Sequence, residues 1–313
     1  MPTENDHRVE SARLPEPTRD LDRVKSDLAE HGYALLRDAL SRNQVLRVKD
    51  RLKEQAEMEG ELGYAIIGDG RFLSRKYNVH AKGDEPWQGI RSLLNKGAVF
   101  QELVGHDGVL EVMEHLLGSG FILYTLSAII MRQGSQAQQM HSDQIMFPFT
   151  TPIPLIANAF FMISDFDEGR GGTRFVPGSH LWDYQMTYQV VKNEQGAADM
   201  VEDRTFEWVS PEAPAGTALL FDARTIHAGG ANISGQERVA VSMAFCLRTI
   251  RQLDQFCMSI NDDAYAAMSE KIKMLVGFGF GDIGRIDPAL GRANIGEVQF
   301  PRIGELRRSG SRD

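Results

Sequence analysis

The sequence predicts a mainly β protein, either a sandwich or a barrel, with α-helices around it. Short apolar runs separated by turn residues fill the stretch 121–248, and such spacing is typical of antiparallel sheets rather than of βαβ units. The part before residue 118 carries apolar residues at helical spacing instead. Hydrophobic residues make up 42% of the 313 residues and charged residues 25%, which leaves enough apolar material for a core.

The first elements are predicted to be helices. Apolar residues recur at helical spacing over 21–28, and Gly32 suits the C-terminus of that helix. A second helix should begin at Ser41, which forms a capping box with Gln44, and run towards Glu59. Three shorter elements are also expected in this part, namely a strand at 33–37 and helices at 98–104 and 108–117.

The remaining elements are a loop, a series of strands and one helix. Glycine and charged residues dominate the stretch 60–90, which has no stable period and is interpreted as a loop or lid. A helix is expected over 263–276 near the end of the chain. Strands are expected at 121–132, 155–164, 173–176, 205–209, 216–221 and 238–248.

These elements are expected to form one domain over 18–280. A flexible leader at 1–17 precedes it and a C-terminal tail at 281–313 follows it. The longest apolar stretch, 121–131, is far too short to span a bilayer. Within the domain we distinguish a helical N-terminal part, a barrel core and a helical cover, at 18–118, 121–248 and 255–280.

Charge and cysteine content exclude several classes of function. The net charge of −9 and the pI near 5.5 argue against nucleic acid as a partner, because such partners need clustered Lys and Arg. Two cysteines, Cys246 and Cys257, do not make a disulfide framework, so a reducing, cytoplasmic compartment is expected. The polar N-terminus lacks the apolar run of a signal peptide, and no membrane partner is expected.

His141 and Asp143 are candidate metal ligands because they lie two residues apart after a predicted strand. In an extended segment such residues project to the same side, so both can face one cavity. His227 is the best candidate for a third ligand. Two imidazoles and one carboxylate form the ligand set of non-haem iron(II) oxygenases. A His-x-Asp pair alone arises easily by chance in a chain with eight histidines, so the triad needs independent support.

Arg238, which follows His227 in the next predicted strand, provides that support. Large and small side chains alternate along this strand. The large face, which we expect to pack outward against helices, consists of Val239, Val241, Met243, Phe245 and Leu247. The small face consists of Ala240, Ser242, Ala244 and Cys246 and leaves room for a ligand. An arginine at its mouth can hold a carboxylate through a bidentate pair, and the alternative is a solvated arginine at a strand end.

Two segments of the sequence are similar to a known family. The run GGTRFVPGSH at 171–180 resembles a signature of the phytanoyl-CoA dioxygenase family. The segment FDARTIHAGGANISGQERVAVSMAF at 221–245 resembles that family's distal-histidine strand pair. The resemblance covers 121–248 well and 20–118 in outline. Three segments have no clear match, namely 60–90, 183–205 and the C-terminal tail.

The resemblance implies a double-stranded β-helix, or jelly-roll barrel, with the metal at one open end. It implies that His141, Asp143 and His227 bind Fe(II), and that 2-oxoglutarate and O₂ are cosubstrates. The implied reaction releases succinate and carbon dioxide while it oxidises a C–H bond of a substrate by hydroxylation, desaturation or epoxidation. Related halogenases lack the carboxylate ligand, so the presence of Asp143 favours these oxidations over halogenation.

The resemblance also implies a cosubstrate site. Arg238 would pair with the distal carboxylate of 2-oxoglutarate, and similar members contact the cosubstrate at positions that are Gln138 and Thr173 here. Asn158 is a further candidate. Without the resemblance, Gln138 is equally well explained as a solvated side chain and Thr173 as a turn residue.

The other histidines are not assigned to the metal. His180 lies in a Pro-Gly-Ser-His turn, where it is expected to fix the following loop. Core or surface roles are expected for His80, His106 and His115.

Five residues are candidate substrate contacts. Tyr77 and Arg91 come from the predicted lid, and Gln144, Met146 and Phe147 follow the aspartate ligand. Met and Phe at these positions are equally well explained by core packing. We expect the substrate to be a mid-sized, largely apolar small molecule, such as a secondary metabolite.

Three other functions and the oligomeric state stay open. An acyl-CoA hydroxylase of the same family would need a basic groove for phosphates, which Arg71, Arg75 and Lys76 could supply. A jelly-roll domain could bind a metal or ligand without turnover. A cupin-like metalloenzyme could use the same ligands without 2-oxoglutarate, but it has no use for a buried Arg238. A homodimer is compatible with the sequence.

Overall fold

A computed structural model describes residues 13–81, 85–192, 200–201, 204–205 and 207–278. The predicted leader, apart from its last residues, and the predicted tail lie outside the described residues. No helix among the described residues is long and apolar enough to cross a membrane.

The main sheet has eight strands, and every neighbouring pair in it is antiparallel. Their order across the sheet is β1 (Tyr33–Leu36), β10 (Ala218–Asp222), β6 (Ile156–Met162), β12 (Arg238–Leu247), β5 (Phe121–Met131), β4 (Trp87–Arg91), β2 (Ala65–Gly68) and β3 (Lys76–Val79). A smaller sheet pairs β7 (Thr173–Phe175) with β11 (His227–Gly229), and β8 (Met200–Val201) pairs with β9 (Arg204–Thr205).

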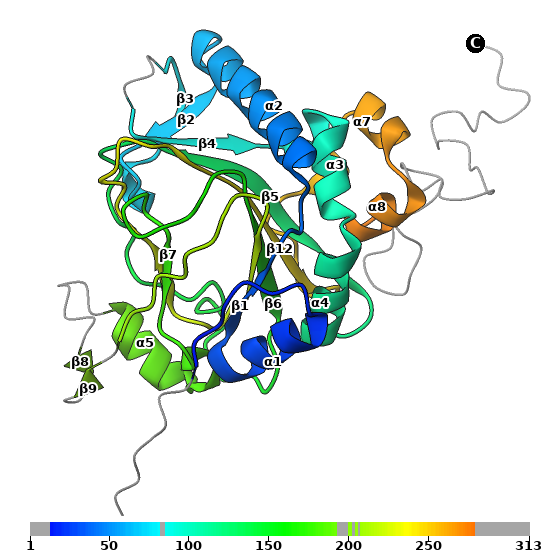
Figure 1. The fold of residues 1–313 in the computed structure, drawn as a ribbon. Helices are drawn as coiled ribbons and strands as arrows, with labels where there is room; N and C mark the ends of the chain where they lie inside the picture. Colours follow the sequence, from blue (N-terminus) through cyan, green and yellow to red (C-terminus); the bar gives the residue numbers. More distant parts are fainter. Residues whose placement is uncertain (1–12, 82–84, 193–199, 202–203, 206, 279–313) are drawn as a thin grey trace, which may run out of the picture.

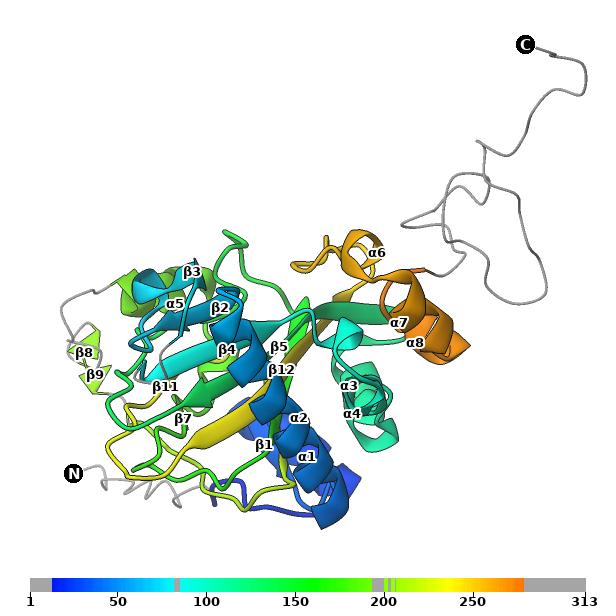
Figure 2. The ribbon, with the colours of Figure 1, turned by 90° about the horizontal axis from the view of Figure 1, so that it is seen from above.

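Helices surround this sheet (Figure 1). They are α1 (Leu21–His31), α2 (Arg42–Glu61), α3 (Ala98–Val104), α4 (Asp107–Leu117), α5 (Tyr184–Lys192), α6 (Phe256–Ser259), α7 (Asp262–Ala267) and α8 (Glu270–Leu275). Figure 2 shows α6, α7 and α8 grouped at one end of the molecule, with α5 and β3 towards the other. The mainly β fold with flanking helices is confirmed.

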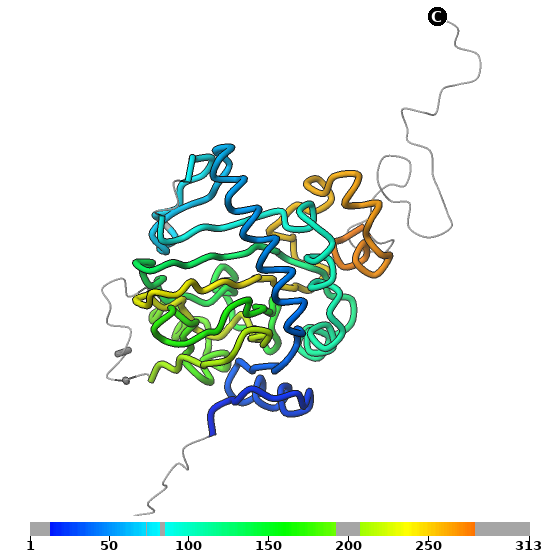
Figure 3. The backbone as a smooth tube through the Cα atoms, turned by 45° about the horizontal axis from the view of Figure 1, so that its top comes forward, coloured from blue at the N-terminus to red at the C-terminus, as the bar shows by residue number. Residues whose placement is uncertain are grey.

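The helices begin and end where local sequence signals place them. Ser41 caps α2, and its side chain accepts a hydrogen bond from the Gln44 amide while the Gln44 side chain accepts from the Ser41 amide. Gly32 ends α1 in the left-handed conformation at φ 80°, which favours glycine. Helix α2 then crosses the strands diagonally (Figure 3).

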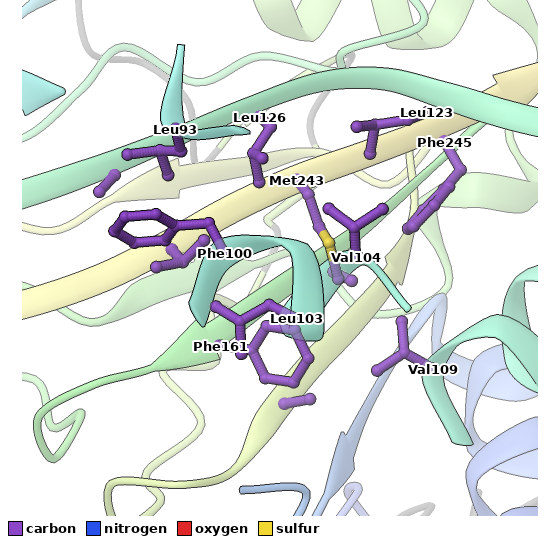
Figure 4. Packing of buried hydrophobic residues seen from close by; sticks show 14 of the residues in the cluster. Leu93, Phe100, Leu103, Val104, Val109, Leu123, Leu126, Phe161, Met243 and Phe245 are labelled. Atoms are coloured by element: carbon purple, nitrogen blue, oxygen red, sulfur yellow. The ribbon is translucent and has the colours of Figure 1, made fainter. Parts of the chain in front are cut away.

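The largest core lies between the helices and the outer face of the main sheet. Val241, Met243 and Phe245 of β12 pack there, together with Phe100 and other residues of α3 (Figure 4). The large face of β12 is therefore packed outward against helices, as the alternation predicts. The opposite, small face of this strand lines a cavity through Ser242 and Ala244, and residues of β7 and β11 line the same cavity.

Truncating one side chain of this core should cost much of the stability. Phe161 on β6 is fully buried, and its ring lies edge-on to His106 at 5.6 Å between centroids. Phe161→Ala should lower the free energy of unfolding by about 3–5 kcal/mol, because it leaves a cavity in a packed core. Urea denaturation measures this, with Met258→Ala as the control because that side chain is 85% exposed. Equal effects of the two substitutions would contradict the packing described.

The interpretation of 60–90 as a loop or lid is wrong where three strands form in that stretch. Strands β2, β3 and β4 form there and extend the main sheet beyond β5. The strands are only four or five residues long, and β3 is largely exposed at the sheet edge, so no alternation marks them. The Trp87 ring lies over Gly89 of β4 and leaves no room for a side chain there. A Cβ at Gly89 would lie 2.7 Å from that ring.

Two later predictions also differ from the structure. The helix expected over 263–276 is divided into α7 and α8, because Ser269 caps a new helix through the Ile272 amide. The strand expected over 205–209 is reduced to β9 and a bridge between Val209 and Phe175. Within it, residue 206 lies outside the described residues.

Candidate metal and cosubstrate site

The structure brings His141, Asp143 and His227 together in one cavity. One potential ligand atom from each lies within 4.8 Å of the others. The Nε2 atoms of His141 and His227 lie 3.6 and 3.7 Å from the two carboxylate oxygens of Asp143. Among the described residues, this is the one group of three such side chains close enough to hold a metal ion. Three ligands on one side of a metal leave positions for other molecules.

Backbone hydrogen bonds join the two histidine segments. The amide of each histidine donates to the carbonyl of the other, at 3.0 and 2.8 Å. Nδ1 of His141 lies 2.9 Å from the Gln139 carbonyl, and Nδ1 of His227 lies 3.0 Å from that of Thr225. Because Nδ1–H donates to a carbonyl in each case, each Nε2 keeps its lone pair for a metal.

Burial and a neighbouring charge keep the His227 imidazole in the neutral form that can bind a metal ion. Its side chain is 4% exposed and packs against the rings of Phe175 and Phe221. Burial, assisted by the neighbouring His141, lowers the pKa of His227 to about 4, although Asp143 opposes the shift. The imidazole is therefore neutral at pH 7, so a proton does not compete with a metal for Nε2.

Asn158 supports the carboxylate ligand. Its side-chain Nδ2 donates to Oδ2 of Asp143 at 2.9 Å, from the adjacent strand β6. Asn158→Ala should weaken Fe(II) binding by roughly 10- to 100-fold, because ligand orientation depends on such hydrogen bonds. Anaerobic Fe(II) titration measures this, with Asn43→Ala as the control because that side chain is exposed on α2 and does not line the cavity. An unchanged affinity would mean that the hydrogen bond does not orient Asp143.

Arg238 is a buried cation with no counter-ion among the described residues. Its side chain is 3% exposed, and its Nη1 donates to the Gly171 carbonyl at 2.6 Å. The guanidinium carbon lies 4.7 Å from the Phe166 ring centroid, and Nε has no hydrogen-bond partner. Burial lowers the pKa of Arg238 to about 10, so it stays protonated at pH 7. A ligand carboxylate would satisfy this charge.

Gln138 and Thr173 lie beside Arg238 in the same cavity. Gln138 Oε1 accepts a hydrogen bond from the Gly229 amide at 3.0 Å, which leaves the side-chain NH₂ for a ligand. Thr173 is 2% exposed and pairs with Gly229 across the β7–β11 sheet. The residues present therefore fit both Fe(II) and a dicarboxylate that reaches from the metal to Arg238.

The cavity around these residues has a volume of about 220 Å³. Two of the five predicted substrate residues, Arg91 and Met146, line it. Tyr77 is 54% exposed on the edge strand β3 and does not line it.

Gln144 and Phe147 also lie outside the cavity lining. The Gln144 side chain is buried and bonds instead to Thr151 Oγ1 at 2.7 Å and the Leu155 amide at 2.8 Å. Phe147 packs against Phe149. Both side chains therefore support the loop after Asp143.

The cavity lining also includes residues that had no assigned role at the metal site in the sequence prediction. Phe72, Arg75 and Trp87 line the cavity, although they come from the stretch interpreted as a loop. The Phe72 ring lies edge-on to His141 at 4.9 Å between centroids. One sequence feature could have indicated the strand β4: Trp87 and Gly89 are two residues apart, so in a strand they share a face and the ring can lie over the glycine.

Three of the other described histidines lie elsewhere. His180 is buried, with Nε2 3.2 Å from the Ala29 carbonyl, and His106 accepts from the Val109 amide at the start of α4. His80 is exposed, and its Nδ1 lies 3.2 Å from the Glu61 carbonyl. None of the three lines the metal cavity.

Parts of this chain are similar in sequence to known dioxygenases. Dioxygenase aneA of Aspergillus aculeatus is 32% identical over 145 residues, which cover 43% of this chain and 44% of that protein. Multifunctional dioxygenase prhA of Penicillium brasilianum is 29% identical over 167 residues, covering 51% and 53%. The matched part of the chain thus spans about half the length of these curated relatives.

A solved structure and a family profile match larger parts. The structure of SnoN, described as a non-heme alpha ketoglutarate dependent epimerase from nogalamycin biosynthesis, superposes with a TM-score of 0.55 at 21% identity. It covers 73% of this chain and 84% of SnoN, and at this identity it supports the fold alone. The profile described as Phytanoyl-CoA dioxygenase (PhyH) matches residues 28–240, more than half of the chain. The chain therefore belongs to the phytanoyl-CoA dioxygenase family.

Proposed function

We propose that this protein is an Fe(II)- and 2-oxoglutarate-dependent dioxygenase. It oxidises a C–H bond of a mid-sized small molecule in a biosynthetic tailoring step, with release of succinate and carbon dioxide. The observation that carries the proposal is the combination of the three candidate ligands with Arg238 in one cavity. A cupin-like enzyme without 2-oxoglutarate would not need a buried, unpaired guanidinium there.

Each side chain has a defined task in this proposal. His141, Asp143 and His227 hold Fe(II), while Asn158 fixes the carboxylate. When bound, Fe(II) and 2-oxoglutarate together supply the activation of O₂. Arg238 binds the distal carboxylate of the cosubstrate and so sets which end reaches the metal.

The cavity wall restricts water around the reacting groups. Phe72, Trp87, Ile129 and Met131 give it an apolar lining. Exclusion of water strengthens the electrostatic interactions inside and limits side reactions. The substrate would enter past Met146, which is 60% exposed at the rim.

An anaerobic spectroscopic experiment tests the proposal. Fe(II) and then 2-oxoglutarate are added to the purified protein without oxygen, and the visible metal-to-ketoacid charge-transfer band is recorded. Oxygen is then admitted and succinate is measured, since turnover of 2-oxoglutarate without substrate is expected at a low rate. We expect both the band and succinate. Absence of both the band and succinate would contradict the proposed function and favour a protein that binds a metal or ligand without turnover.

A further inference from the structure

The turn between strands β2 and β3 lies beside the candidate metal ligand His141. Gly70 and Phe72 of this turn line the metal cavity. The Gln136 amide donates to the Asp69 carbonyl at 2.6 Å, which joins the turn to the segment that leads to His141. The two backbones pass so closely that a Cβ at Gly70 would lie 2.5 Å from the Gln136 carbonyl oxygen. A turn at the edge of the main sheet therefore reaches the metal site.

Phe72 is the residue through which this turn contacts His141. Its ring lies edge-on to the imidazole, with 4.9 Å between the centroids. The Asp69 amide donates to Ser74 Oγ at 3.1 Å, and Ser74 Oγ donates to the Arg71 carbonyl at 2.8 Å, so the turn is closed by its own hydrogen bonds. These bonds fix the backbone, whereas the Phe72 side chain is 38% exposed. Its ring needs a further contact to stay against the imidazole.

His141 is less enclosed than the other candidate histidine ligand. The His227 side chain is 4% exposed and packs against two phenylalanine rings, whereas the His141 side chain is 19% exposed. Nδ1 of His141 contacts the Gln139 carbonyl, which lies two residues earlier in the same segment. The Phe72 ring comes from a distant part of the chain. It can therefore restrain the His141 imidazole independently of that segment.

Arg75 connects the Phe72 ring to a fixed part of the sheet. Its guanidinium carbon lies 4.6 Å from the Phe72 ring centroid and 4.8 Å from that of Trp87, within the range of cation–π attraction. Trp87 is 4% exposed and packs with Ile66 and Met131, so its ring is a firm support. No carboxylate among the described residues acts on the charge of Arg75. Aromatic rings rather than an acid therefore hold this guanidinium.

We propose that Arg75 is a positioning residue for the metal. Packed on Trp87, it holds the Phe72 ring against His141 and so keeps that imidazole in the orientation that binds iron. This rests on the proposed function, in which His141 is an iron ligand. A planar guanidinium can stack on two rings at once, which explains an arginine at this position. Arg75 acts through Phe72, so its effect on iron requires that ring.

Anaerobic metal titration tests this inference. Arg75→Met removes the charge and keeps a long apolar side chain, and Phe72→Leu removes the ring. We expect each to raise the dissociation constant for Fe(II) about three- to tenfold, as the loss of one aromatic contact does. Each should also shift the visible d–d bands of the protein loaded with Co(II), because those bands depend on how the ligands are oriented. Arg75→Lys keeps the charge and should lie between the wild type and Arg75→Met.

A double variant shows whether Arg75 acts through Phe72. In Arg75→Met/Phe72→Leu the affinity for Fe(II) should fall no further than in the weaker-binding single variant, because both substitutions remove the same contact. Lys76→Met is the matched control, since it removes an exposed charge at the next position, outside the cavity lining, and should change neither readout. Thermal unfolding of the metal-free proteins shows which variants are folded. Arg75→Gln, with the same expected result, takes the place of Arg75→Met if that variant does not fold.

The outcomes separate this inference from the proposed function. If the wild type binds Fe(II) and Arg75→Met binds it equally well with unchanged Co(II) bands, the positioning role is overturned. Fully additive losses in the double variant also overturn it, because Arg75 then acts by a route other than Phe72. So does a loss of affinity for 2-oxoglutarate, measured by the charge-transfer band, without a loss for Fe(II), since Arg75 then serves the cosubstrate. A wild type that binds no Fe(II) contradicts the proposed function, and this inference with it.

Discussion

Replacing His141 with alanine should abolish stable iron binding by this protein. The two remaining ligands, Asp143 and His227, cannot hold Fe(II) on one face of the metal against water. Loss of a supporting hydrogen bond typically weakens metal binding by roughly 10- to 100-fold, and loss of a ligand should cost more than that. Iron content after anaerobic loading and desalting measures the effect directly.

A second histidine provides the control for this prediction. His80→Ala removes an exposed imidazole outside the cavity and should leave iron content unchanged. Circular dichroism should show the same fold for both variants, since His141 is not part of the core. If His141→Ala retained iron as the wild type does, the metal would have to be held by other side chains.

Replacing Arg238 with alanine should spare iron but remove most of the affinity for 2-oxoglutarate. The guanidinium is buried, and its loss leaves the distal carboxylate of the cosubstrate without a partner in a site closed to water. Truncating one partner of such a pair costs roughly 2–5 kcal/mol, which corresponds to a dissociation constant about 30-fold to several thousand-fold higher. Titration of the charge-transfer band with 2-oxoglutarate measures the change.

Two further variants make this measurement specific. Arg238→Lys keeps the charge but not the planar fork, so its affinity should lie between those of the wild type and Arg238→Ala. Arg19→Ala removes an exposed arginine paired with Asp38 and should have no effect. An unchanged 2-oxoglutarate affinity in Arg238→Ala would show that the cosubstrate carboxylate lies elsewhere.

Much of the fold could be predicted because its signals are local. The Ser41 capping box and Gly32 act within one turn of a helix, so the sequence places those boundaries directly. The alternation along β12 is equally local and predicts which face is packed and which is open. The short strands β2, β3 and β4 form instead because each pairs with a neighbour, which a window of sequence does not reveal.

The residues of the candidate site also fall into those that local sequence predicts and those that depend on distant contacts. His141 and Asp143 are predictable as a pair since both lie in one extended segment. His227 is distant in the sequence. It was the best candidate for a third ligand and gained support from Arg238 and from the family resemblance. Gln144 was expected at the substrate because it follows Asp143, but two hydrogen bonds turn its side chain into the loop. Arg75 could not be placed at the metal, because its position depends on a stack of Phe72 and Trp87.

The reciprocal backbone hydrogen bonds between His141 and His227 have a consequence for how the length of this chain can vary. They hold together the two ends of the chain segment that runs from His141 to His227. That segment includes 183–205, which has no clear match in the family. Insertions and deletions there can therefore be accommodated without separating the two histidines that are candidate iron ligands. For engineering, this separates the part of the chain that can change in length from the side chains that are candidate iron ligands.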